Sequence, residues 1–301
     1  MSTQLSLHPE VASALRDGHP VVALESTILS HGLPPGRNLD VAHRIEQVVR
    51  AGGAVPATIA VLDGRPVIGL SPAELERVCA PDAGLDKLSL RDLGPAVGLG
   101  RSGATTVAGT SALAAAAGIG VFATGGLGGV HLGAAQSWDV SADLGVLAKL
   151  PTVVVCSGVK SVLDIAATLE VLETNSVPVL GYRTDDFPAF YLRSSGHSVG
   201  WRVDDAEQAA AVIAAHRAYA PSGVLLTNPI PEQSKMDKTL HDRLLEEGLN
   251  LLRENNVHGS DVTPVLLEHF HTASGGVSID ANEALVLSNA KLAAEVAVAL
   301  S

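Results

Sequence analysis

Residues 120–160 read GVFATGGLGGVHLGAAQSWDVSADLGVLAKLPTVVVCSGVK and indicate how the chain folds. Two short apolar runs, Val121–Ala123 and Val153–Cys156, are bounded by glycine or proline and are typical of buried strands. Further strands are expected at residues 19–24, 54–62, 66–70, 177–182 and 223–227. Helical segments separate most of these runs, so the sequence predicts an α/β fold with a largely parallel central sheet.

Local signals define several other elements. Asp63-Gly64 lies between two apolar runs and predicts a β-hairpin. SPAE at residues 71–74 predicts a capped helix N-terminus with proline in its first turn. Prolines and polar residues predict loops at 25–36 and 183–200. Helices are expected at residues 38–51, 71–79, 105–117, 161–174, 204–218, 235–255, 263–272 and 280–300.

The composition limits the class of protein. The chain has 301 residues, of which 47% are hydrophobic and 17% charged, and we find no linker or repeat, so we predict one globular domain over residues 1–301. A net charge of −12 without a basic run argues against nucleic-acid binding. No signal core begins the chain, and the uncharged residues 102–130 are too rich in glycine for a membrane span. The chain has two cysteines and no pattern of a disulfide framework, which suggests the reducing cytoplasm.

A glycine-rich loop, ATGGLGG, follows the first strand of the opening stretch at residues 123–129. Glycine lets backbone N–H groups approach a ligand closely, and phosphate is a common ligand of such loops. The loop does not match G-x-G-x-x-G, and no P-loop lysine follows it. A tight turn between packed elements is therefore the alternative interpretation.

Lys160 and Glu25 are the candidates for covalent and acid–base chemistry. Lys160 follows a buried strand, and we expect a helix to begin at residue 161. A helix N-terminus and apolar surroundings lower the pKa of a lysine, and a neutral amine can form a Schiff base with a sugar aldehyde. Glu25 ends another strand, at the edge where α/β sheets bind ligands, and can serve as a general acid or base. The alternatives are a surface lysine and a carboxylate that caps a helix or meets solvent.

Four further residues could complete a site. Asp139 and Asp143 are four residues apart and would share a face on a helix, where they could hold Mg²⁺ or Mn²⁺ or simply be solvated. His131 could bind a metal or a substrate, or be a structural histidine. Lys87 could supply positive charge for an anionic substrate, although alone it is typical of a surface lysine.

With these residues in place, the sequence resembles the pseudouridine-5′-phosphate glycosidase family, also called pseudouridylate synthase. The resemblance extends over nearly the whole chain from about residue 18. The matching runs include ALESTILSHGLP (23–34), PATIAVLDG (56–64), ATGGLGGVH (123–131), SWDVSADL (137–144), VVVCSGVKSVLDI (153–165), FPAFYLRSSG (187–196), LLTNPIPE (225–232) and ANEALVLSNAKLAAEVA (281–297).

The resemblance implies a metal-dependent lyase, typically trimeric, that cleaves or makes the C-glycosidic bond between uracil and ribose 5-phosphate. It implies Glu25 as proton donor, Lys160 as nucleophile and Asp139 as the ligand of Mn²⁺, with Mg²⁺ or another divalent ion possible. The substrate-binding positions that it implies are Lys87, Val107, Ser141, Ala142 and Asp143, with Thr124, His131 and Asn289 nearby in family motifs.

Two departures and two alternatives accompany the resemblance. Glu283 stands where we expect an apolar residue, and residues 268–276 are rich in histidine; both concern local packing or assembly. One alternative is a sugar-phosphate-binding protein without turnover, and the other is a related indigoidine synthase A-like enzyme with a different substrate. Glu25 and Lys160 together favour an enzyme, since binding alone needs neither.

Overall fold

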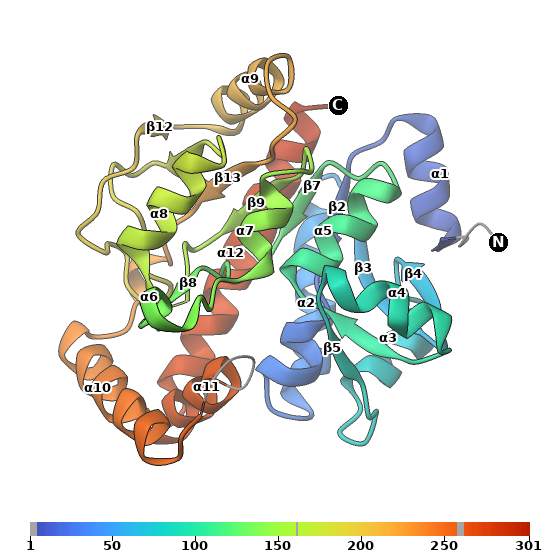
Figure 1. Cartoon of the computed structure of the whole chain (residues 1–301). Coiled ribbons are helices and arrows are strands. Elements are labelled where there is room, and N and C mark those ends of the chain that lie inside the picture. The colour runs from blue at the N-terminus through green and yellow to red at the C-terminus, as the bar shows by residue number, and fades with distance from the viewer. Residues whose placement is uncertain (1–4, 161, 258–261) are drawn as a thin grey trace.

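The computed structural model describes residues 5–160, 162–257 and 262–301 (Figure 1). The strands are β1 (Ser6–Leu7), β2 (Val21–Leu24), β3 (Val55–Leu62), β4 (Arg65–Ile68), β5 (Asp86–Leu88), β6 (Gly103–Thr105), β7 (Val121–Ala123), β8 (Val130–His131), β9 (Val153–Cys156), β10 (Leu163–Asp164), β11 (Val179–Tyr182), β12 (Trp201–Val203) and β13 (Val224–Thr227). The helices are α1 (Pro9–Asp17), α2 (Arg37–Ala51), α3 (Pro72–Cys79), α4 (Leu90–Gly98), α5 (Val107–Ala116), α6 (Ala134–Ser137), α7 (Ala142–Leu147), α8 (Ile165–Thr174), α9 (Ala206–Arg217), α10 (Lys238–Glu254), α11 (Val262–Ala273) and α12 (Val277–Ala299). A π-helix, η1 (Ile28–Gly32), and a 3₁₀ turn, η2 (Glu232–Ser234), complete the set.

One eleven-stranded sheet runs through the molecule in the order β1-β4-β3-β2-β7-β9-β13-β11-β12, with β6 beside β3 and β5 beside β6. Each neighbouring pair from β3 to β12 is parallel. Among the described residues, the antiparallel pairs of this sheet are β3 with β4 and β3 with β6. The predicted α/β fold with a largely parallel sheet is confirmed.

Helices cover both faces of the sheet (Figure 1). Strand β9 shows the division: Val153 and Val155 belong to the core shared with α2, α9 and α12, whereas Val154 and Cys156 belong to the core shared with α1, α5, α7 and α8. Because both faces are buried, the parallel strands consist of continuous apolar runs. This explains why residues 121–123 and 153–156 were recognisable as strands.

The long helix α12 lies against the middle of the sheet and is buried on nearly all sides. Alanine, leucine and valine are spread around its circumference, as expected for a helix surrounded by protein. Glu283 is an acidic residue among the buried positions of this helix. Its carboxylate is 7% exposed and forms ion pairs with Arg37 and Arg44 of α2, the second at 3.1 Å. The acidic residue at this position therefore joins α12 to α2.

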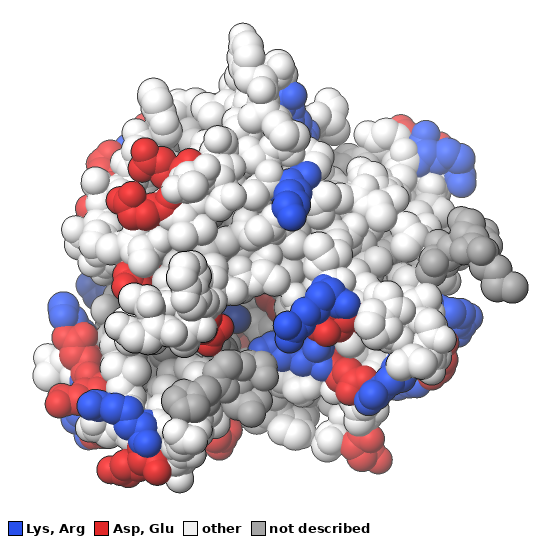
Figure 2. All heavy atoms as spheres, in the orientation of Figure 1, with Lys and Arg blue, Asp and Glu red and all other residues white. Residues whose placement is uncertain are grey.

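Helices α10 and α11 pack against each other at one end of the molecule (Figure 1). Gly248 of α10 permits their close approach, because a Cβ atom there would lie 2.5 Å from Leu266. Helix α11 also contacts η1 and α12. None of the described helices is long and apolar enough to cross a membrane. Figure 2 shows charged side chains of both signs in small groups, with broad uncharged areas between them.

The local signals have mixed outcomes. Strands β3 and β4 form the predicted hairpin, with Asp63 and Gly64 at φ 51° and 72°, and α3 begins with the predicted capping box. The prediction of a loop at residues 25–36 is wrong in part, since η1 lies within it. The loop at 183–200 is irregular, but its central residues Phe187, Phe190 and Tyr191 are buried.

Candidate active site

A cavity opens at the carboxyl ends of β2, β7 and β9, where α/β sheets commonly bind ligands. It brings together Glu25, Lys87 and Lys160, which are distant in sequence. The other lining residues are Thr27, Ile28, His31, Gly32, Gly125, Gly126, Phe190, Pro264, Leu267 and Asn282. Two lysine side chains and one carboxyl group thus share a partly apolar chamber.

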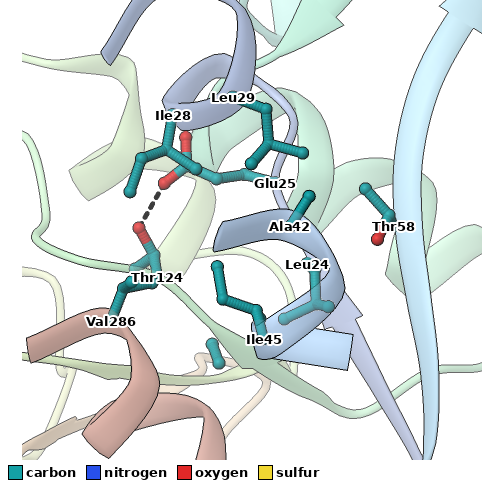
Figure 3. Close-up of a pocket in the computed structure, with 10 residues that line it drawn as sticks. Leu24, Glu25, Ile28, Leu29, Ala42, Ile45, Thr58, Thr124 and Val286 are labelled. Carbon is teal, nitrogen blue, oxygen red and sulfur yellow. Dashed lines mark hydrogen bonds between the residues drawn. The ribbon is translucent and has the colours of Figure 1, made fainter. Parts of the chain in front are cut away.

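Glu25 is the first residue after β2, and its carboxylate accepts a hydrogen bond from the Thr124 hydroxyl (Figure 3). Glu25 and Thr124 also line a narrow apolar space, together with side chains that include Ile28, Leu29 and Val286 (Figure 3). Burial raises the pKa of Glu25, and Lys160 and the Thr124 hydrogen bond oppose this effect. A carboxyl group held in this way keeps its proton to higher pH and suits a general acid.

Lys160 lies in the turn that follows β9. Its backbone N–H donates to Leu127 O at 3.2 Å, and the Leu127 N–H donates to Gly158 O at 2.9 Å, so this turn pairs with the glycine-rich loop. The predicted helix start at residue 161 is wrong: α8 begins at Ile165, because residues 163–164 pair with β8 first. Residue 161 itself lies outside the described residues. The expected helix dipole is therefore not next to Lys160.

An apolar crevice also borders Lys160, on the side toward α11. The side chains that line it with Lys160 are Val162, Phe190, Tyr191, Leu266, Leu267 and Phe270. The apolar surroundings expected for the lysine are thus present, although they come from segments far along the chain.

Only part of the glycine-rich loop faces the cavity. Gly125 and Gly126 line it, whereas the Gly128 N–H donates to the Asp143 carboxylate at 2.9 Å. A Cβ atom at Gly128 would lie 2.4 Å from Oγ of Ser141, which caps α7, and a Cβ atom at Gly129 would lie 2.4 Å from Oγ1 of Thr168 in α8. Glycine is needed there for close packing, as the alternative interpretation proposed, and only residues 125–126 are open to a ligand.

The acidic pair is arranged differently from the prediction. Asp143 lies in the first turn of α7, whereas Asp139 lies between α6 and α7, where Trp138 has φ 58° and ends the first helix. The two carboxylates therefore do not share a helix face. Asp143 is 6% exposed and accepts hydrogen bonds from the N–H groups of Ala108 and Gly128, both at 2.9 Å. It joins the start of α5 to the glycine-rich loop.

Asp139 lies beside His131, with 3.8 Å between the carboxylate and Nδ1, and the His131 N–H donates to Asp139 O. Burial lowers the pKa of His131, Asp139 opposes this, and Lys160 and Lys87 lower it further, so all three lie within electrostatic reach of the ring. Among the described residues, no group of three or more His, Cys, Asp and Glu side chains could hold a metal ion. Asp139 and His131 could supply two ligands, which fits Mn²⁺ or Mg²⁺ that keeps several waters.

The other predicted positions are not among the residues that line the cavity. They are Val107, Thr124, His131, Asp139, Ser141, Ala142, Asp143 and Asn289. Asn289 is fully buried; its amide donates to Thr124 O at 2.8 Å and accepts from Asn228 at 3.0 Å. It therefore supports the backbone of the glycine-rich loop from behind. Ser141 caps α7, and its hydroxyl accepts from the Asp143 N–H.

Three polar residues of the cavity were missed by the sequence analysis. The Oδ1 atom of Asn282 and the Oγ1 atom of Thr27 are buried and have no hydrogen-bond partner within the described part of the chain. His31 has its Nδ1 2.6 Å from Ser30 Oγ, and burial lowers its pKa. All three lie inside sequence runs that carried the resemblance, so those runs held the signal. Unpartnered polar atoms facing a cavity are suited to binding the hydroxyl or phosphate groups of a ligand.

The chain is similar to known proteins over nearly its whole length. The family model for indigoidine synthase A-like protein matches residues 10–299. The chain is 57% identical to the pseudouridine-5′-phosphate glycosidase of Salinispora tropica over 292 residues, which is 96% of this chain and 90% of that protein. It is 54% identical to the protein of the same name from Streptomyces griseus, over 97% of this chain and 91% of that protein.

Two solved structures share the whole fold. The prealnumycin C-glycosynthase AlnA, in complex with ribulose 5-phosphate, matches with a TM-score of 0.91 and 41% identity, over 100% of this chain and 98% of that chain. An indigoidine synthase A-like protein from Thermotoga maritima matches with a TM-score of 0.88 and 36% identity, over 98% and 95%. The chain therefore belongs to the indigoidine synthase A-like family and, within it, to the pseudouridine-5′-phosphate glycosidases.

Proposed function

We propose that this protein cleaves the C-glycosidic bond of pseudouridine 5′-phosphate, reversibly, to give uracil and ribose 5-phosphate. One observation carries the proposal: a lysine and a carboxyl group with a raised pKa line the same cavity. The names of the relatives supply the substrate, and the C-glycosynthase bound to a pentulose phosphate supports a sugar phosphate in this fold.

The chemistry explains why a lysine is needed. A C-glycosidic bond has no oxygen or nitrogen leaving group to protonate, so paired carboxylates alone serve it poorly. The Lys160 amine bonds to C1′ of the ribose while the C1′–O4′ bond breaks, and O4′ takes the proton of Glu25. The nitrogen, now positively charged, then passes one proton to the Glu25 carboxylate, and the product is an open-chain sugar attached to a neutral lysine nitrogen.

Carbon–carbon cleavage follows from this adduct. The nitrogen lone pair of Lys160 forms a C=N bond to C1′, and the electron pair of the C1′–C5 bond passes to the uracil ring, whose C5 takes the proton that Glu25 received from the nitrogen. Water then hydrolyses this iminium, which frees Lys160 and ribose 5-phosphate. Overall, one water is consumed for each bond cleaved, and Glu25 regains its proton before the next turnover.

The direct test is incubation of the protein with pseudouridine 5′-phosphate and Mn²⁺, with free uracil measured by chromatography. The reverse reaction, from uracil and ribose 5-phosphate, should form pseudouridine 5′-phosphate. Binding of ribose 5-phosphate without any uracil release or C–C bond formation would instead favour a sugar-phosphate-binding protein.

Asp139 is the proposed ligand of a divalent ion, with His131 beside it. The ion would supply positive charge that stabilises oxyanions of the reacting groups. Asp139→Ala should weaken Mn²⁺ binding at least about tenfold and remove the stimulation of turnover by Mn²⁺. Electron paramagnetic resonance measures the binding, and wild-type protein treated with EDTA is the reference for activity. If Asp139→Ala in EDTA were as active as untreated wild-type protein with Mn²⁺, the assignment would be contradicted.

Lys87 is the proposed contact of the 5′-phosphate, because it lines the cavity that Gly125 and Gly126 also line. A charged hydrogen bond contributes about 1.5–3 kcal/mol, so Lys87→Ala should weaken ribose 5-phosphate binding about 10- to 100-fold. Calorimetry measures this, and binding of unphosphorylated pseudouridine should change little. Lys149→Ala is the matched control, since Lys149 lies in a surface hollow outside the cavity. Equal losses for the two ligands would argue against a phosphate contact.

Association into a trimer and a cytoplasmic location, which the sequence analysis predicts, are part of this proposal. Gel filtration with light scattering tests the first of them.

A further inference from the structure

The segment 187–192 lies inside the molecule, although the loop that contains it is polar at both ends. Its backbone is held at three points. The Phe190 N–H donates to Ser157 O at 2.9 Å, the Met236 N–H donates to Tyr191 O at 3.0 Å, and Ala189 forms a bridge with Gly158. The segment is therefore fixed directly against the turn that leads to Lys160.

Ser157 connects this segment to the glycine-rich loop as well. Its N–H donates to Gly125 O at 2.9 Å, while its own carbonyl accepts from Phe190. Gly158 completes the contact: it has φ 79°, and a Cβ atom there would lie 2.0 Å from Pro188 O. Three backbone segments, at 125, 157 and 190, thus lie side by side with no space between them.

The Phe190 ring occupies the place where these segments meet the cavity. It lines the cavity and also the apolar crevice, and Lys160 lines both. A Cβ atom at Gly126 would lie 2.7 Å from Cδ2 of this ring. The ring is in edge-to-face contact with Tyr191, with 4.6 Å between centroids. Phe190 thus lies against the glycine-rich loop and lines the same two spaces as the lysine.

The backbone of Phe190 is unusual. Its φ is 58°, in the left-handed region that an aromatic residue rarely adopts and that glycine or asparagine adopts more easily. Strain of this kind persists only where the surroundings hold it, and it is concentrated at functional sites. Here the surroundings are the Ser157 hydrogen bond and the glycines that leave space for the ring.

We propose that Phe190 is a positioning residue for Lys160. The inference rests on the proposed function, because it assigns Phe190 a part in adduct formation. The ring keeps the distance between the glycine-rich loop and the Lys160 turn fixed. It also closes the side of the cavity next to the lysine. With a smaller side chain, the lysine amine samples more orientations relative to the sugar. Such misplacement slows bond formation without removing the groups that bind phosphate.

The test measures how fast ribose 5-phosphate is attached to Lys160. Wild type, Phe190→Leu and Phe190→Gly are mixed with saturating ribose 5-phosphate, quenched with borohydride at timed intervals and analysed by mass spectrometry. Leucine keeps most of the apolar volume, and glycine accepts the left-handed backbone and so tests the ring separately from the strain. We expect the rate of adduct formation to fall about 10- to 100-fold in both variants, while the Kd for ribose 5-phosphate changes less than about threefold.

Phe122→Leu is the matched control. Phe122 is also completely buried, but it belongs to the core on the α5 and α7 face and lines neither the cavity nor the crevice. It should lose comparable stability, measured by thermal unfolding, with an unchanged rate of adduct formation.

Three results would overturn the inference while leaving the proposed function intact. They are an unchanged rate in both Phe190 variants, an equal fall in Phe122→Leu, or a loss confined to Kd. If the wild-type protein itself forms no adduct with ribose 5-phosphate, the proposed function fails first.

Discussion

Replacement of Lys160 by alanine should abolish both uracil release and the borohydride-trapped adduct with ribose 5-phosphate. The loss of turnover should be about 10⁴-fold or more, as expected when the group that forms the covalent intermediate is removed. Wild-type protein treated in the same way should carry the mass of one reduced ribose 5-phosphate per chain. Peptide mapping should locate that mass on Lys160, which lines the cavity together with Gly126 and Phe190.

Two further variants make this result specific. Lys160→Arg keeps the positive charge but cannot form the adduct, so it should be as inactive as Lys160→Ala. Lys87→Ala keeps the nucleophile, so its adduct should still form on Lys160 when ribose 5-phosphate is supplied above its weakened Kd. An adduct on Lys87 in the wild type, or turnover without any trapped adduct, would show that the lysine assignment is wrong.

Glu25→Gln should lower turnover about 10²- to 10⁴-fold, the usual contribution of a general acid or base. Glutamine retains an acceptor for the Thr124 hydroxyl but has no proton to give to O4′. Binding of ribose 5-phosphate should therefore change little, and kcat should carry the loss. A variant that keeps kcat and loses affinity would show that Glu25 binds the sugar rather than transferring a proton.

The same substitution should make the protein more stable at neutral pH. Burial raises the pKa of Glu25 above its ordinary value of 4.5. Below 4.5 the carboxyl group is protonated in both the folded and the unfolded chain. As the pH rises from 4.5 through the higher native pKa, the unfolded chain loses its proton first, and the free energy of unfolding decreases.

Glutamine has no such proton, so the difference in free energy of unfolding between Glu25→Gln and wild type should grow with pH above 4.5 and then level off. Denaturation by urea at a series of pH values measures it. Thr227→Val, a change away from the carboxyl group, provides a pH-independent comparison, since the Thr227 hydroxyl donates only to Leu180 O. A constant difference between Glu25→Gln and wild type at all pH values would contradict the raised pKa.

Much of the fold could be predicted because its signals are local. Residues 121–123 and 153–156 are apolar on both faces of the sheet, so each strand is a continuous run that a reader of the sequence can see. The Asp63-Gly64 hairpin and the capping box of α3 also involve neighbouring residues only. Glu25 and Lys160 could be proposed because each directly follows such a strand or its turn.

The errors have a common physical cause, which is tertiary pairing between distant segments. Residues 163–164 have the composition of a helix start, yet they pair with β8 and delay α8. The spacing of Asp139 and Asp143 suits one helix, but Asp139 and Val140 pair with β8 and separate α6 from α7. Asn282 reaches the cavity from α12, more than a hundred residues after Lys160, and no local pattern distinguishes it from Asn289.

The position of α12 in the sequence has a consequence for synthesis on the ribosome. This helix comes last, yet it contacts β2, β7 and β9 at the centre of the sheet and brings Asn282 to the cavity and Asn289 to the back of the glycine-rich loop. Until it emerges from the exit tunnel, the sheet face that it covers is exposed apolar surface, which favours association with chaperones or with other nascent chains. A polypeptide released before this helix is complete lacks Asn289, which supports the glycine-rich loop. We therefore expect premature termination to yield inactive fragments rather than weakly active ones.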